Sequence, residues 1–231
     1  MPRMSYHHCP SRQGFSLIEL LAVMAVFAIL TAILIPAISH IRRNAMVVKD
    51  ADQIRQIGLG IFSYAHDHEL RLPGPLYTNQ MTHYRAGSFS GHLSSILPEY
   101  VDAPPPDDQL RVLSLMVDPV WEEIVADPDV YNATCYRVIQ LKPRETSATF
   151  IKGQNIFGYA GYTGQDESKR SPLRLSQVPE TIPFSGIPII TNKNLAELDD
   201  LPSHQDRRNI LFLDGHVETF QSEDPEFDEY Y

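Results

Sequence analysis

The longest uninterrupted apolar segment of the chain runs from Leu20 to Ile38 and contains no charged side chain. Eleven of its positions are Leu, Ile, Val or Phe. Such side chains contribute about −0.3 to −0.6 kcal/mol each to membrane insertion, roughly −3 to −7 kcal/mol together, against about +3 kcal/mol for a carboxylate at the centre of a span. Glu19 lies at the end of the segment, where its cost is smaller. The pattern predicts a helix whose residues 15–40 span a bilayer.

The pattern changes after this segment, because apolar side chains then recur every three or four residues. This spacing is typical of a helix with one buried face. The predicted buried stripe comprises Ile38, Ile41, Ala45, Val48, Ala51, Ile54, Ile57, Ile61 and Tyr64. The predicted solvent face comprises Arg42, Arg43, Lys49, Asp50, Asp52, Arg55 and Gln56. We expect one long helix, interrupted in its hydrogen bonding only at Pro36, whose amphipathic half covers residues 41–72 and ends before Pro73.

Residues 73–231 are predicted to form an α+β head. The predicted strands cover residues 130–141, 151–157 and 187–191. Helices are predicted at residues 92–100, 109–116 and 119–125, and residues 77–91 are predicted to be a loop. Two apolar runs separated by Asp214-Gly215 predict a C-terminal β-hairpin with a two-residue type I′ turn. The predicted fold class is therefore α+β, with the long N-terminal helix packed on a small antiparallel sheet.

Net charge argues against a nucleic acid partner, and cysteine content argues against an intramolecular disulfide. The net charge is −10, and removal of residues 1–14 would change it to −12, because Arg3 and Arg12 are lost with no acidic residue. An acidic surface repels phosphates, so no nucleic acid partner is expected. The two cysteines are Cys9 and Cys135, and only Cys135 follows the apolar segment. We expect no intramolecular disulfide in a chain that has lost its first residues.

The residues Gly14-Phe15-Ser16-Leu17-Ile18-Glu19-Leu20 precede and open the apolar segment. This run resembles the processing site of type IV prepilins and type II secretion pseudopilins. The resemblance implies that a prepilin peptidase cleaves between Gly14 and Phe15, removes the leader 1–14, and methylates the new amino terminus. It also implies a pilin-like fold, with Glu19 as the fifth residue of the mature chain and Pro36 at a position where many pilins carry a helix-interior proline.

A physical argument supports a role for Glu19 in assembly. The ammonium of Phe15 and the carboxylate of Glu19 on a neighbouring subunit are each expensive in lipid, and each neutralises the other when helices stack with a fixed stagger. Within one chain, the carboxylate also lies in the first helical turn, where the helix dipole favours negative charge. The alternative is an ordinary signal anchor in which Glu19 has no such role. Charge near the segment does not set its orientation, whereas the resemblance implies a cytoplasmic leader and an external head.

A second resemblance lies near the C-terminus, where nine residues separate His204 from Asp214-Gly215. This spacing resembles a His-x9-Asp-Gly signature of prepilin-processed proteins in planctomycetes, verrucomicrobia and related bacteria. The favoured interpretation is structural: Asp214 shapes the turn, and His204 closes the preceding loop onto the hairpin. The alternative is a divalent metal site formed by His204, Asp214 and His216, with Glu218 or Asp206 completing it. Calcium or another divalent ion would then be the cofactor, whereas the structural interpretation needs none.

The resemblance therefore implies a structural, filament-forming subunit and not an enzyme. The sequence also contains no Gly-x-Ser-x-Gly, no His-Glu-x-x-His and no phosphate loop, although this does not exclude a carboxylate-based hydrolase. The expected partners are a prepilin peptidase, other pilin or pseudopilin subunits, the inner-membrane assembly machinery and membrane lipid. The expected location is the bacterial inner membrane, crossed once, with a periplasmic head or a place in a cell-surface filament. The alternative is a membrane-tethered periplasmic domain that binds carbohydrate or metal, or hydrolyses a substrate, and uses the anchor only for placement.

Overall fold

A computed structural model describes residues 16–121, 134–139, 156–161, 170–195, 201–202, 204 and 206–224. The chain divides into two compact units, residues 1–44 and 45–231. The long helix α1 covers Leu17–Asp67 and contributes to both. The predicted leader, residues 1–14 with Cys9 and Gly14, lies outside the described residues, and so does Phe15.

Within the first unit, α1 carries no charged side chain from Leu20 to Ile38 and continues through Pro36. Its large side chains are exposed, as Leu20, Phe27 and Ile33 show with exposures of 62%, 59% and 67%. The helix is long and apolar enough to cross a membrane, and none of that apolar window is buried inside the structure. An exposed apolar surface of this extent needs a lipid or protein partner.

The part of α1 in the second unit buries one face. Its buried residues are Val47, Asp50, Ile54, Ile57, Gly58, Gly60, Ile61 and Ala65. The predicted stripe is confirmed at Ile54, Ile57 and Ile61. It is wrong one and two turns earlier, because Val48 is 70% exposed and Asp50, predicted to face solvent, is fully buried.

The helix ends at Asp67, earlier than the predicted limit at residue 72. Glu69 and Leu70 adopt left-handed backbone conformations with φ of 55° and 62°. The Leu70 amide then donates to the carbonyl of Ala65 at 2.8 Å, which satisfies one of the carbonyl groups left open at the helix end. The local backbone therefore stops the helix before Pro73 is reached.

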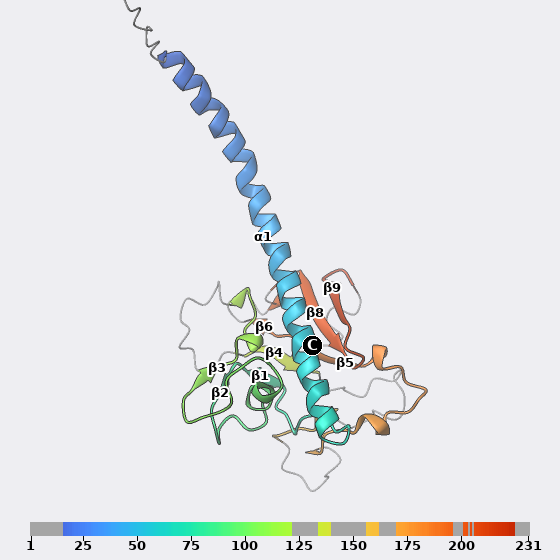
Figure 1. Ribbon diagram of the computed structural model, residues 1–231. Helices are drawn as coiled ribbons and strands as arrows, with labels where there is room; N and C mark the ends of the chain where they lie inside the picture. Colours follow the sequence, from blue (N-terminus) through green and yellow to red (C-terminus); the bar gives the residue numbers. More distant parts are fainter. Residues whose placement is uncertain are drawn as a thin grey trace, which may run out of the picture. The chain divides into compact units, whose positions relative to one another are not determined.

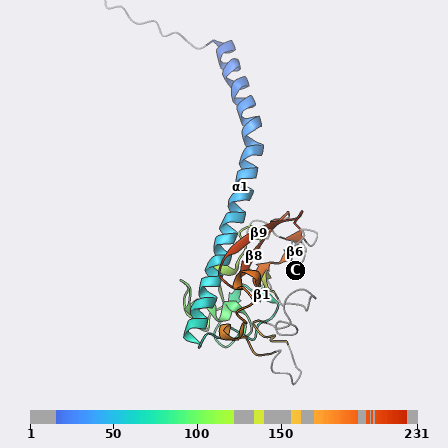
Figure 2. The same ribbon diagram turned by 90° about the vertical axis from the view of Figure 1, so that its right-hand side faces the viewer.

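The head contains a five-stranded antiparallel sheet in the order β1-β4-β5-β8-β9. These strands are β1 (Asn79–Met81), β4 (Thr134–Val138), β5 (Pro188–Asn192), β8 (Arg207–Phe212) and β9 (Val217–Gln221). Two small antiparallel pairs accompany it, β2 (His83–Tyr84) with β3 (Arg111–Val112) and β6 (Asn194–Leu195) with β7 (Leu201–Pro202). Figures 1 and 2 show β8 and β9 beside the C-terminal half of α1. The predicted fold class, a long helix with a small antiparallel sheet in a pilin-like α+β architecture, is confirmed.

Short 3-10 helices connect these strands: η1 (Leu93–Ser95), η2 (Leu97–Glu99), η3 (Ser114–Met116), η4 (Leu175–Gln177) and η5 (Phe184–Gly186). The predicted helix at residues 92–100 is thus two single turns. The predicted loop at 77–91 is wrong, since it holds β1 and β2, and the predicted helix at 109–116 is β3 followed by η3. Residues 156–157 are not in a strand, and the rest of the strand predicted there lies outside the described residues.

One apolar core joins α1 to the sheet. Ile57 and Ile61 on the helix belong to the same buried cluster as Cys135, Ile189 and Leu211 on the strands. The approach is close at Gly58, where an added Cβ would lie 3.0 Å from Leu211 Cδ2. Helix and sheet therefore stabilise each other, because each covers the apolar face of the other.

The C-terminal hairpin is confirmed, but its turn is not the predicted type I′ turn. A type I′ turn needs positive φ at both central residues. Only Gly215 has it, at φ +91°, whereas Asp214 does not. The Gly215 amide donates to the carbonyl of Phe212 at 2.9 Å, and the Phe212 amide donates to the carbonyl of His216 at 3.0 Å. The loop thus has three residues, and the glycine occupies its left-handed position.

Candidate functional site

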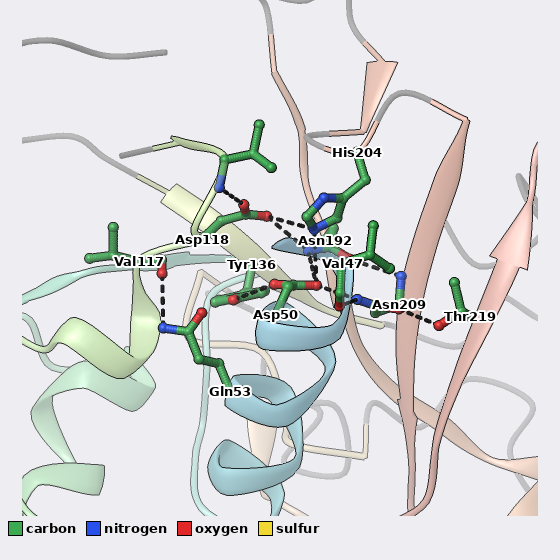
Figure 3. Close-up of polar contacts among 11 residues, drawn as sticks. Val47, Asp50, Gln53, Val117, Asp118, Tyr136, Asn192, His204, Asn209 and Thr219 are labelled. Carbon is green, nitrogen blue, oxygen red and sulfur yellow. Dashed lines mark hydrogen bonds and ion pairs between the residues drawn. The ribbon is translucent and has the colours of Figure 1, made fainter. Parts of the chain in front are cut away.

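Six buried polar side chains meet where α1 faces the sheet, and we call them the Asp50 cluster (Figure 3). They are Asp50, Asp118, Tyr136, Asn192, His204 and Asn209. All are fully buried except His204, whose exposure is 8%. A buried carboxylate is unstable unless other groups compensate its charge, so the partners of the two aspartates decide what the cluster can do.

Asp50 is the hub of the cluster. It lies on the buried face of α1 and accepts hydrogen bonds at both carboxylate oxygens. The hydroxyl of Tyr136 donates to Oδ1 at 2.6 Å, and the side-chain amide of Asn192 donates to Oδ2 at 3.0 Å. The side-chain amide of Asn209 donates to the same Oδ2 and, at 3.1 Å, to the carbonyl of Val47. One helical side chain thereby holds three strands.

The donors to Asp50 come from one row across the sheet. Tyr136 on β4 lies opposite Asn192 on β5, and Asn209 on β8 lies opposite Thr219 on β9. The backbone amide of Asn209 donates to the side-chain oxygen Oδ1 of Asn192 at 2.9 Å. The hydroxyl of Thr219 donates to the side-chain oxygen Oδ1 of Asn209 at 2.6 Å. These bonds fix which end of each Asn amide faces the carboxylate. The register of the sheet therefore positions the hydrogen-bond donors.

Asp118 reaches the cluster from the segment after η3. Gln53, one turn along α1 from Asp50, holds this segment against the helix. Its Nε2 donates to the carbonyls of Ser114 and Val117, each at 3.2 Å. The Asp118 Oδ1 accepts the Val120 amide at 2.8 Å, a local turn that aims the carboxylate. Its Oδ2 accepts Asn192 Nδ2 at 3.0 Å. The two carboxylates thus share one amide.

His204 closes the cluster from the turn before β8. Its Nε2 lies 3.3 Å from Asp50 Oδ2 and 3.8 Å from Asp118 Oδ2, yet it satisfies hydrogen-bond geometry with no described group. Burial lowers the pKa of His204, but Asp50 and the negative charge of Asp118 outweigh it and hold the pKa above its ordinary value. The ring lies within ion-pair distance of Asp50 Oδ2, but its Nε2 is not aligned to donate a hydrogen bond to that oxygen. The imidazole is therefore close to both carboxylates and firmly bonded to neither.

Tyr136 stays protonated in this setting. Burial, followed by the negative charge of Asp50, holds the pKa of its hydroxyl well above the ordinary value. The hydroxyl therefore remains a donor to Asp50 over the whole physiological pH range. Tyr136 orients the carboxylate and is not itself poised to lose a proton.

Cys135, beside Tyr136 on β4, is a free buried thiol with 1% exposure. Burial raises its pKa, so almost no thiolate is present at neutral pH. Because the thiolate is the reactive form, we expect Cys135 in a Cys9→Ser chain to react with a maleimide at least about tenfold more slowly in the folded than in the urea-unfolded protein. Mass spectrometry of the labelled chain over time measures this. Equal rates in the two states would contradict the burial of this strand.

The structure separates His204, Asp214 and His216, the three residues of the alternative metal site. His204 precedes β8, whereas Asp214 and His216 lie at the turn after it, and six strand residues span about 20 Å. Asp214 Oδ1 instead accepts the backbone amide of His216 at 3.1 Å and contacts its Nδ1. Burial raises the pKa of Asp214, but the hydrogen bonds and charge of His216 outweigh it, so the pKa is lowered overall. His204 joins Asp50 and Asp118 rather than the hairpin turn.

The residues predicted to act in assembly, Glu19 and Pro36, lie in the part of α1 that belongs to the first unit. Glu19 is exposed in the first turn, where its Oε2 accepts the Ser16 amide at 2.9 Å. This bond satisfies one of the amides left open at a helix start. Pro36 lies within the exposed apolar part of the helix. Gly14 and Phe15 are outside the described residues.

Comparison with known proteins identifies the N-terminal segment. Residues 9–35 match the family model described as the prokaryotic N-terminal methylation motif. This match supports a type IV prepilin- or pseudopilin-like protein, and it suggests a structural subunit. The motif implies processing by a prepilin peptidase and assembly with other pilin subunits, and together with the apolar helix it is consistent with a single-pass inner-membrane anchor.

Searches of curated proteins and of solved structures found no match. The matched segment does not reach His204, Asp214 or Gly215. The resemblance to a His-x9-Asp-Gly signature, and to the bacterial groups that carry it, therefore stays a prediction.

Proposed function

We propose that the chain is a pilin-like subunit that a prepilin peptidase cleaves between Gly14 and Phe15 and that assembles into a type IV pilus or a type II secretion pseudopilus. The methylated Phe15 becomes the amino terminus, and Glu19 pairs with that terminus on a neighbouring subunit. The apolar part of α1 packs in the filament core, and the head faces the periplasm or the filament surface.

The observation that carries this proposal is the methylation motif at residues 9–35, which overlaps a helix whose membrane-length apolar window is not buried inside the structure. Burial of apolar surface stabilises by roughly 25 cal/mol per Å², so such a helix is stable in lipid or against copies of itself. The hydrogen bond between Ser16 and Glu19 supports the assembly role as well, because it keeps the carboxylate at the first turn without neutralising it.

The proposal predicts a processed amino terminus in protein purified from its native membrane. We expect mass spectrometry to find a chain that begins at Phe15 and carries one methyl group on that residue. We also expect Glu19→Ala and the isosteric Glu19→Gln to be processed but to be lost from sheared, pelletable filaments, because both remove the charge that fixes the stagger.

The matched control is Asp52→Ala, which removes an exposed carboxylate from the same helix. It should enter filaments normally. An intact Met1 in the native protein would contradict the proposed processing, and normal filament entry of both Glu19 variants would contradict the proposed assembly role.

The alternative of a tethered binding or hydrolytic domain receives no comparable support. The side chains of Asp50, Asp118 and His204 are at most 2% exposed, so the polar cluster is placed to hold the head together and not to meet a substrate at the surface. This burial favours a structural role for the head.

A further inference from the structure

We propose that Asp50, Asp118 and His204 form a structural binding site for one divalent transition-metal ion, such as zinc, inside the head. The three residues come from α1, from the segment after η3 and from the turn before β8. Among the residues that the structure describes, they are the group in which three ligating atoms of His, Cys, Asp or Glu lie within 4.8 Å of one another.

The spacing of the ligating atoms suits a small ion. Zinc binds imidazole nitrogen and carboxylate oxygen at about 2.0–2.2 Å, so two ligands on a tetrahedral ion lie about 3.4 Å apart. His204 Nε2 lies 3.3 Å from Asp50 Oδ2 and 3.8 Å from Asp118 Oδ2. Shifts of a few tenths of an ångström would bring all three atoms to bonding distance.

The environment of His204 Nε2 indicates that this nitrogen binds a ligand. The His204 side chain is 2% exposed, and Figure 3 shows its ring turned toward both carboxylates. Its Nε2 nonetheless has no hydrogen-bond partner among the described residues. A buried polar atom without a partner costs about 1–3 kcal/mol. Coordination of a metal would satisfy this nitrogen, which lies 3.3 Å from Asp50 Oδ2 without forming a hydrogen bond to it.

Charge balance favours the same conclusion. Two carboxylates share this buried space, and like charges at such short separation repel. Tyr136, Asn192 and Asn209 supply neutral donors, so their bonds orient the carboxylates without cancelling their charge. A divalent cation with a neutral imidazole brings the net charge of the three ligands and the ion to zero.

The surrounding hydrogen bonds have the form of a prepared outer shell. Ligating carboxylates in metal sites are usually held by further hydrogen bonds that fix their direction. Here Tyr136 holds Asp50 Oδ1 and the Val120 amide holds Asp118 Oδ1, so each carboxylate is anchored by the oxygen that faces away from His204. The opposite oxygen of each, Oδ2, lies nearest the imidazole and also accepts the shared amide of Asn192.

The donor set selects the class of ion. Imidazole suits zinc, copper, iron and nickel, whereas calcium takes six to eight oxygen ligands. One nitrogen and two carboxylates therefore favour zinc or a similar transition metal over calcium. Because the site is buried, the ion would cross-link the helix to two distant segments of the head rather than act on a substrate.

Zinc binding by the whole chain tests the proposal. The full-length protein in detergent is stripped with EDTA, loaded with zinc chloride and dialysed, and its zinc content and thermal midpoint are measured. We expect the wild-type chain to retain about one zinc ion. The His204→Gln variant and the isosteric Asp118→Asn variant should bind zinc at least tenfold more weakly. Zinc should raise the thermal midpoint of the wild-type chain only.

The matched control is His216→Gln, which removes an imidazole from the hairpin turn and should leave zinc affinity unchanged. If the ligand variants fail to fold, cobalt loading of the wild-type chain gives an independent readout, since a site of this kind produces visible absorption that zinc abolishes. The proposal is overturned if the wild-type chain retains no zinc and gives no cobalt signal, if both ligand variants bind as wild type does, or if calcium alone stabilises the protein.

Discussion

Replacement of Asp50 by Ala is expected to lower the free energy of unfolding of the head by about 3–5 kcal/mol, the range for breaking a buried charged network from one side. The substitution leaves the Tyr136 hydroxyl and the side-chain amides of Asn192 and Asn209 without their shared acceptor. Each buried donor left without a partner costs about 1–3 kcal/mol. Because these donors lie on three adjacent strands, the loss extends across the sheet.

Urea unfolding of the full chain in detergent measures this effect through Trp121, the single tryptophan, which lies in the core of the head. Asp52→Ala is the matched control on the same helix. Asp52 is 61% exposed and accepts a hydrogen bond from Gln56 at 2.7 Å, so its removal should change stability by less than about 0.5 kcal/mol. Equal, small effects of the two substitutions would contradict the central role of Asp50.

The buried face of α1 could be predicted from the sequence only in part. The three-four spacing predicts the buried positions Ile54, Ile57 and Ile61 correctly, because apolar side chains there alternate with polar ones. It fails at Val48 and Asp50, because the predicted stripe continues the line of Ile38 and Ile41, and these two side chains are 52% and 67% exposed in the structure. A membrane segment carries no information about which face the head covers. The stripe Val47-Asp50-Ile54 has the same spacing but requires a buried charge.

The remaining members of the cluster could not be found from local pattern. Asp118 and Asn192 each follow an apolar run and Asn209 precedes one, so each looks like an ordinary polar residue at the edge of such a run. Asn192 and Asn209 meet through the pairing of β5 with β8, and Asp118 meets them from the segment after η3. Register depends on pairings between strands that are far apart in the sequence. The spacing from Asp214 does draw attention to His204. In the structure this spacing reflects the length of β8, which separates His204 in the buried cluster from Asp214 in the hairpin turn.

The apolar contact between α1 and the sheet should carry the second large effect. Ile57 is fully buried, whereas Leu59, two residues further along the helix, is 61% exposed. Truncation of a buried Ile to Ala removes apolar contacts and leaves a cavity, and we expect Ile57→Ala to destabilise the head by about 2–5 kcal/mol. Leu59→Ala removes a side chain of the same size from the surface and should change stability by less than about 0.5 kcal/mol.

Urea unfolding followed by Trp121 fluorescence distinguishes the two variants, and the filament assay separates the head from the anchor. Ile57 packs in the head, and the proposed assembly residues lie in the other unit, so Ile57→Ala should still be cleaved after Gly14. Leu59 presents its apolar side chain outward, so a loss of filaments in Leu59→Ala at unchanged stability would assign this face of α1 to subunit contacts. A loss of stability in Leu59→Ala equal to that of Ile57→Ala would instead show that the buried face of the helix has been placed wrongly.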